Sequence, residues 1–183
     1  SSNKFNFPWS IAVITDQFEP GSTYIIVTAI AAMDQGKLNL FEEYNCENGE
    51  FIYFDKKIED HEKYGHLNLS QIMKYSSNIG IIKIAEKIGS KTLYKYSRLF
   101  GFGSKSKIDL YGETNGSLKD EKKWSKISLG QISMGHEIGV TALQLALAYS
   151  AIANGGYLIK PYIVDEINSK KEKLYKKTNP KII

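Results

Sequence analysis

The chain has 183 residues, of which 42% are hydrophobic and 24% are charged. This length and composition are typical of one globular domain that buries its own core. The net charge is +4, but Arg98 is the only arginine, and surfaces that bind nucleic acids rely strongly on arginine. The charge balance therefore does not indicate a nucleic-acid partner.

The hydrophobic residues occur in short runs. No run approaches the ~20 residues that a membrane-spanning helix needs, and the first residues do not resemble a signal peptide. The start at Ser1-Ser2-Asn3 leads us to expect a piece excised from a longer protein. Cys46 is the single cysteine, so no disulfide can form within the chain, and we expect it to be a buried structural thiol.

The first third of the chain is expected to contain one long helix and one hairpin. An apolar run predicts a helix from residue 22 to about 33, which Gly36 ends. The dipeptide Asn48-Gly49 lies between two runs that are rich in aromatic residues. This arrangement predicts a β-hairpin that turns at Asn48-Gly49.

The rest of the chain is mostly helical by its pattern. Helices are predicted over residues 69–74, 79–88, 91–100 and 141–154. The last has the clearest periodicity, with Leu143, Leu147 and Ala151 on one face. A Gly-rich polar connection is expected over 101–126, and a strand over 157–167.

Two short motifs carry the functional signal. Residues 18–25 read Phe-Glu-Pro-Gly-Ser-Thr-Tyr-Ile, and Ser76-Ser77-Asn78 begins 54 positions after Ser22. This resembles the transpeptidase domain of class B penicillin-binding proteins, where a Glu-Pro-Gly-Ser-Thr-x-Lys run precedes a Ser-x-Asn motif.

The resemblance extends over most of the chain. The matching segments include Asp60 with Tyr64-Gly65, then residues 76–89, 100–103 and 108–113, then Ser133 to Leu145, and finally 153–156 with Pro161. It implies an α/β (α+β) fold like that of penicillin-binding proteins and serine β-lactamases. Residues 1–183 would form part of one transpeptidase domain, mostly its helical lobe with a partial sheet, and its C-terminal strands would be missing.

The resemblance also assigns roles to individual residues. Ser22 would be the nucleophile that attacks a D-alanyl-D-alanine stem peptide or a β-lactam. Ser76 would relay a proton to the leaving amine, Asn78 would hold the substrate's peptide carbonyl, and Lys74 would be a further cation near that edge of the cleft. No metal and no organic cofactor are implied.

Two departures from the family pattern bear on activity. Ile25 stands where the motif has the lysine that activates the serine, and an apolar side chain cannot accept a proton. Loss of a general base costs roughly 10²–10⁴-fold in rate. The Lys-Thr-Gly motif is also absent, and loss of one oxyanion-hole donor costs about 10²–10³-fold. The chain as given is therefore expected to be inactive.

The family implies a setting in the cell wall. We expect a parent protein that is anchored in the bacterial cytoplasmic membrane, faces its extracytoplasmic side and works within a division or elongation complex. The fragment itself is expected to be soluble. Its partners would be peptidoglycan stem peptides and β-lactams. The missing strands would leave an open sheet edge, through which the fragment is expected to self-associate.

Alternative interpretations stay open. A non-catalytic scaffold domain of the same fold would explain Ile25. A β-lactam sensor or serine β-lactamase is disfavoured by the Glu-Pro-Gly before Ser22. His136-Glu137 begins like a zinc-protease motif, but Val140 stands where the second histidine would be, so a structural role is expected for this pair.

Overall fold

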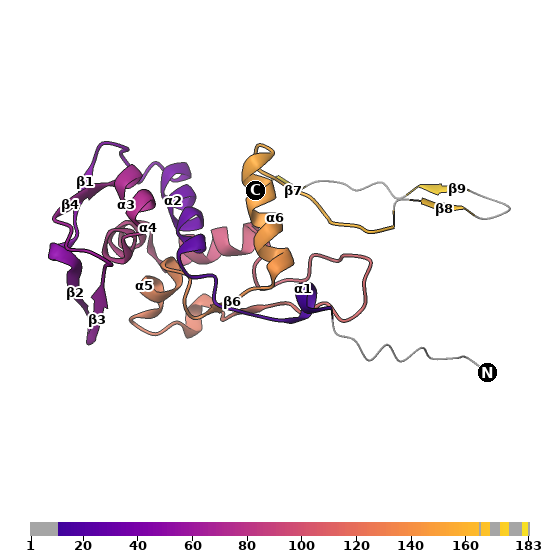
Figure 1. Ribbon diagram of the computed structural model, residues 1–183, viewed down its shortest axis with the longest axis horizontal. Helices are drawn as coiled ribbons and strands as arrows, with labels where there is room; N and C mark the ends of the chain where they lie inside the picture. The colour runs from indigo at the N-terminus through magenta and orange to yellow at the C-terminus, as the bar shows by residue number, and fades with distance from the viewer. Residues whose placement is uncertain (1–10, 165, 169–172, 176–180, 183) are drawn as a thin grey trace.

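The computed structural model describes residues 11–164, 166–168, 173–175 and 181–182. Figure 1 shows a group of helices, with the strands β1 (Glu43–Asn45) and β4 (His66–Asn68) at one end of the molecule and helix α6 (Ala142–Ala153) toward the other. Within the described residues, the strands form five two-stranded antiparallel sheets. A mostly helical lobe with a partial sheet was predicted, and this prediction is confirmed.

The predicted helix after Gly21 is confirmed, with a different first turn. Residues Gly21–Tyr24 form a 3₁₀ turn, η1, and the α-helix proper is α2 (Ile25–Asp34). The residue at the N-cap position of α2 is Tyr24, and it makes no side-chain capping bond. Ser22 therefore lies in the turn that precedes α2.

The predicted hairpin at Asn48-Gly49 is wrong in its pairing. These residues lie in a 3₁₀ turn, η2 (Glu47–Gly49), in which Asn48 has a left-handed φ of 52°. The hairpin joins β2 (Glu50–Tyr53) to β3 (Lys56–Glu59) instead, and β1 pairs with β4. Asparagine tolerates the left-handed region, so Asn-Gly marked a turn but did not specify the strands that it separates.

The two helices that bracket the Ser-x-Asn motif have strong caps. Helix α3 (Leu69–Tyr75) begins at a capping box, in which Asn68 Oδ1 accepts from the Gln71 amide at 3.0 Å and Gln71 Oε1 accepts from the Asn68 amide at 2.9 Å. Helix α4 (Asn78–Leu99) combines the next two predicted helices and bends at Gly89, where φ is 76°. The predicted helices are therefore present, and the predicted break at Gly89 is a kink.

The C-terminal part contains elements that the pattern predicted only in part. Helix α6 begins at a capping box between Thr141 and Gln144, and its buried residues are Gln144, Ala148 and Ala151, so only Ala151 of the predicted face is buried. Of the predicted strand over 157–167, the described residues form strand only at 157–158 and 166–167. The remaining elements are α1 (Ala12–Thr15), β5 (Ser117–Leu118), η3 (Glu121–Lys123), α5 (Ser128–Ser133), β6 (Ile138–Gly139), β7 (Tyr157–Leu158), β8 (Glu166–Asn168), β9 (Lys173–Tyr175) and β10 (Lys181–Ile182).

The core consists of two hydrophobic clusters that meet at α2. Ile25, Ala29 and Ala32 occupy one face of α2 and belong to the first cluster, which also contains the buried Cys46. Val27 and Ala31 occupy another face and belong to the second. Helix α2 packs against α4, so burial of both faces fixes the turn that holds Ser22. Cys46 is a buried free thiol, as predicted.

Candidate active site

Ser22 is exposed and lies on a turn whose backbone is fixed by hydrogen bonds. The amide of Gly21 donates to the carbonyl oxygen of Gly135 at 3.1 Å, and the Ile25 amide donates to the Ser22 carbonyl. Gly21 has a φ of 54° and Gly135 a φ of 81°, in the region that favours glycine. A Cβ on Gly135 would lie 2.2 Å from the Gly21 oxygen, so only glycine permits this approach.

Glu19 ties the same turn to the loop after Gly135. Its carboxylate lies 2.9 Å from His136 Nδ1 and accepts from the Glu137 amide at 2.9 Å. The hydrogen bond from His136, followed by that from the Glu137 amide, holds the pKa of the Glu19 carboxyl below its usual value. The Glu137 carboxylate in turn accepts from Ser128 Oγ at 2.7 Å. The His136-Glu137 pair thus connects the segment before the Ser22 turn to α5, in line with the predicted structural role.

Ile25 belongs to the hydrophobic core. Its side chain is only 2% exposed and lies in the first cluster, together with Ile79 and Met134. Ser22, three positions earlier, is exposed. The position from which a lysine would activate the serine is therefore filled by an apolar side chain, and Ile25 itself provides no base.

Ser76 lies at the junction of α3 and α4 in a strained conformation. It is the C-cap of α3, with a left-handed φ of 55° and ψ of 44°. Its Oγ is buried and has no hydrogen-bond partner among the described residues. Buried hydroxyls are nearly always paired, and residues in rare backbone regions cluster at functional sites. The missing hydrogen-bond partner and the rare backbone conformation both indicate that this hydroxyl binds a polar group of another molecule.

The rest of the Ser-x-Asn motif is anchored by Asp60, whose role the sequence did not reveal. Asp60 accepts from Ser77 Oγ at 2.6 Å and from the Ile79 amide at 3.1 Å, while Ser77 Oγ also accepts from the Gly80 amide at 3.0 Å. These bonds satisfy the first amides of α4. The available signal was that Asp60, with Tyr64-Gly65, resembles the family segment that precedes the Ser-x-Asn motif.

Asn78 and Lys74 differ in how firmly they are held. Asn78 Nδ2 donates to the Glu59 carbonyl at 2.9 Å, which fixes its amide against the end of β3. That bond uses one of the two Nδ2 hydrogens, so the other hydrogen and the side-chain carbonyl oxygen can still bind a ligand. Lys74 is exposed, with its Nζ 5.1 Å from the centre of the Tyr75 ring.

A lysine from the β2–β3 hairpin reaches this side of the molecule, and nothing in the sequence predicted it. Lys56 Nζ donates to Gln131 Oε1 at 2.8 Å, and its charge is one of the minor causes that lower the pKa of Glu19. Gln131 Nε2 is buried without a partner among the described residues. The structure thus brings Glu19, His136 and Lys56 near the turn that carries Ser22.

The family follows from the comparison with known proteins. A model of the penicillin binding protein transpeptidase domain matches residues 1–182. The chain belongs to this family. The predicted resemblance to class B penicillin-binding proteins is therefore confirmed.

Curated relatives and a solved structure agree with this assignment. The chain is 33% identical over 166 residues to the stage V sporulation protein D of Bacillus subtilis, covering 89% of this chain and 26% of that protein. It is 31% identical over 160 residues to the peptidoglycan D,D-transpeptidase FtsI of Escherichia coli, covering 85% and 26%. Penicillin-binding protein 3 of Mycobacterium tuberculosis superposes with a TM-score of 0.86 at 25% identity, covering 93% of this chain and 38% of that one.

The match is to a part of longer proteins. The chain spans about a quarter of the length of the curated relatives named above. Among the residues that the structure describes, no helix is long and apolar enough to cross a membrane, and no group of three or more histidine, cysteine or acidic side chains is placed to hold a metal ion.

Proposed function

We propose that this chain is part of a peptidoglycan D,D-transpeptidase in which Ser22 forms the acyl-enzyme. The observation that carries the proposal is the placement of an exposed Ser22 on a turn fixed by Gly135 and Glu19. The family and the name of the Escherichia coli relative support the same activity. The substrates would be cell-wall stem peptides. β-Lactams would react as well, because their strained amide is attacked in the same way as the peptide amide.

The proposed chemistry is acyl transfer in two steps. Ser22 Oγ bonds to the carbonyl carbon of a D-alanyl-D-alanine peptide, the C–N bond breaks, and the proton from Oγ ends on the departing amine. The amine of a second stem peptide then attacks the ester carbonyl carbon, a new C–N bond forms, the C–O bond to Ser22 breaks, and a proton from that amine returns to Ser22 Oγ. Ser76 would pass the proton to the leaving amine, and Asn78, whose amide is held by Glu59, would bind the peptide carbonyl.

Ile25 is expected to make the acylation of Ser22 slow in this chain. An aliphatic side chain in the core accepts no proton, so Ser22 lacks the base that the family motif supplies. We expect acylation roughly 10²–10⁴-fold slower than in a variant with lysine at this position.

The experiment is acylation of the full-length protein by a penicillin, followed by intact mass. Ile25→Lys is expected to speed adduct formation, the matched apolar variant Ile25→Met to leave it unchanged, and Ser22→Ala in the Ile25→Lys background to abolish it. Circular dichroism verifies that each variant is folded. A folded Ile25→Lys protein that forms no adduct would overturn the assignment of Ser22.

A non-catalytic role in cell-wall assembly is the second candidate, and the burial of Ile25 among apolar neighbours favours it. In that case Ile25→Lys places a charge in the core, lowers the free energy of unfolding and adds no acylation. Reading the codon at this position in the natural gene separates a natural isoleucine from an altered one.

We further propose the cellular setting from the family. Penicillin-binding protein 3 of Mycobacterium tuberculosis has been solved with aztreonam and with ampicillin, and β-lactam binding by the parent of this chain is proposed by analogy. The parent would be anchored in the cytoplasmic membrane, act on its outer face and join a division or elongation complex. Self-association of the fragment stays a prediction, for which sedimentation at rising concentration is the test.

A further inference from the structure

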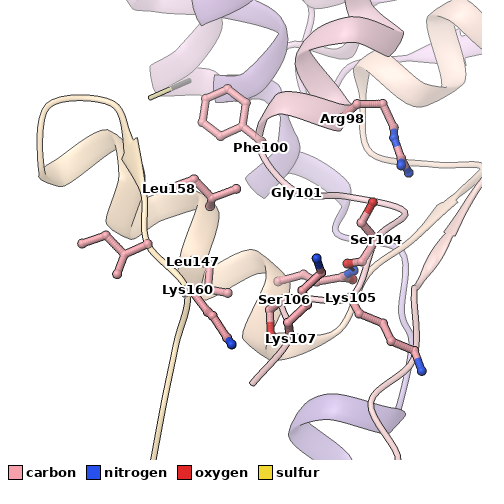
Figure 2. A pocket seen from close by; sticks show the side chains of 12 residues that line it. Arg98, Phe100, Gly101, Ser104, Lys105, Ser106, Lys107, Leu147, Leu158 and Lys160 are labelled. Carbon is pink, nitrogen blue, oxygen red and sulfur yellow. Dashed lines mark hydrogen bonds between the residues drawn. The ribbon is translucent and has the colours of Figure 1, made fainter. Parts of the chain in front are cut away.

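A cavity that does not include Ser22 opens between four elements of the C-terminal part. The end of α4, the segment 104–107, helix α6 and the strand β7 surround it, as Figure 2 shows. Its volume is about 300 Å³. Ligand sites in proteins span ≈ 300–1,000 Å³, so this cavity is large enough for one side chain of a bound molecule and little more.

The lining combines cations with an apolar floor. Phe100, Leu147 and Leu158 supply the apolar surface. Among the residues that the structure describes, no aspartate or glutamate lines the cavity, and none of its four cations makes a salt bridge. The four cations are Arg98, Lys105, Lys107 and Lys160.

Arg98 is held in place by the loop that follows α4. Its Nη1 donates to the Phe102 carbonyl at 3.2 Å and to the Gly103 carbonyl at 2.6 Å. A Cβ on Gly103 would lie 2.6 Å from that nitrogen, so glycine is required for the guanidinium to lie there. The cation is therefore pre-organised at the edge of the cavity.

Lys107 occupies a backbone conformation that does not suit a lysine. Its φ is 63°, in the left-handed region that glycine adopts without cost. Glu113 holds the loop in this shape, because its carboxylate accepts from the Ser106 amide at 2.6 Å and the Lys107 amide at 3.0 Å. Glycine would adopt this backbone conformation without strain, so the lysine side chain is present here at a conformational cost.

Lys160 stands on the opposite wall. Figure 2 shows its side chain extending toward the side of the cavity that Ser106 and Lys107 occupy. The segment after it is tied back by Asp109, whose two carboxylate oxygens accept from the amides of Ile163 and Val164 at 2.8 and 3.0 Å. The carboxylates of Glu113 and Asp109 thus accept hydrogen bonds from backbone amides.

We propose that this cavity binds an acidic peptide segment of a partner protein. An apolar side chain of the segment would fill the floor at Phe100, Leu147 and Leu158, and carboxylates on either side of it would face Lys107 and Lys160. A small inorganic anion would leave the apolar floor uncovered, which is why a peptide that carries both features fits better. The proposal does not depend on the activity of Ser22.

The test is fluorescence anisotropy of the full-length protein with a labelled synthetic peptide in which Leu-Phe is flanked by two glutamates on each side. Lys107→Gly and Lys160→Gln are each expected to weaken binding about threefold, the typical effect of one exposed ion pair. Lys126→Gln, at an exposed lysine outside the cavity, is the matched control and is expected to change nothing. Added salt is expected to weaken binding.

Lys107→Gly also separates binding from folding. Because glycine suits the backbone at this position, this variant is expected to be at least as stable as the parent in urea unfolding while it binds the peptide more weakly. The proposal is overturned if the charge-swapped peptide with four lysines binds equally well, if the acidic peptide does not bind, or if the cavity variants bind as the control does. It is also overturned if only vesicles of phosphatidylglycerol respond to the cavity variants, since the site would then be a lipid site.

Discussion

The backbone amide of Gly21 and the carbonyl of Gly135 are joined by a 3.1 Å hydrogen bond, although 114 positions separate them in the chain. The contact seats the turn that carries Ser22 on the loop that carries His136. The close approach requires glycine at position 135, where a Cβ would lie 2.2 Å from the Gly21 oxygen, and it links the two halves of the candidate site.

Gly135→Ala is expected to destabilise the fold strongly. The new Cβ would lie 2.2 Å from the Gly21 carbonyl oxygen at a φ of 81°, so the turn must move. The expected loss is about 2–4 kcal/mol in the free energy of unfolding. Gly36→Ala is the control, because Gly36 also has a positive φ but has no atom within 4 Å of the added carbon. Equal losses for the two variants in urea unfolding would show that the close approach is unimportant.

Glu19 is expected to make stability depend on pH in the acidic range. The hydrogen bond from His136 is the largest cause that lowers its pKa below the ordinary 4.5. A carboxyl with a lower pKa in the folded state stabilises the protein above its unfolded pKa and loses that contribution as the pH falls through the folded value. The stability difference between the parent and Glu19→Gln should therefore shrink as the pH falls below 4.5. Urea unfolding over a pH series measures it, and a difference that does not vary with pH would contradict the prediction.

Asp60 is expected to matter for the start of α4. It accepts hydrogen bonds from Ser77 Oγ and the Ile79 amide. Asp60→Ala leaves both donors without this acceptor, with an expected loss of about 1–3 kcal/mol. Asp55→Ala in the exposed turn of the β2–β3 hairpin is the control and should cost little. If the two variants unfold at the same denaturant concentration, the anchoring role is wrong.

Cys46 is expected to react slowly with thiol reagents in the folded protein. Burial is the largest cause that raises the pKa of its thiol above the ordinary 9.0, and the thiolate is the reactive form. A chromogenic disulfide reagent at neutral pH should therefore label it only when the chain unfolds. Rapid labelling of the folded chain would show that the thiol is accessible.

Several elements were predictable because their signals are local. The capping residues Asn68 and Thr141 lie within three positions of the groups they bind, and an apolar run identified α2. Hydrogen bonds and side-chain contacts over three or four positions form within one turn, so they can be recognised in a short stretch of sequence. The motifs around Ser22 and Ser76 likewise indicated the family before any contact was known.

The pairing of strands and the completion of the site were decided by the tertiary structure. Asn48-Gly49 marked a turn, but β1 found its partner in β4, because strand pairing depends on which faces the core buries. Glu19 meets His136 across 117 positions, and Lys56 reaches Gln131 across 75. The sequence by itself determined the helices α2, α3, α4 and α6, the caps at Asn68 and Thr141, and the family. The packing of α2 against α4 decided which distant side chains lie near Ser22, because burial of both faces of α2 fixes the turn that carries it.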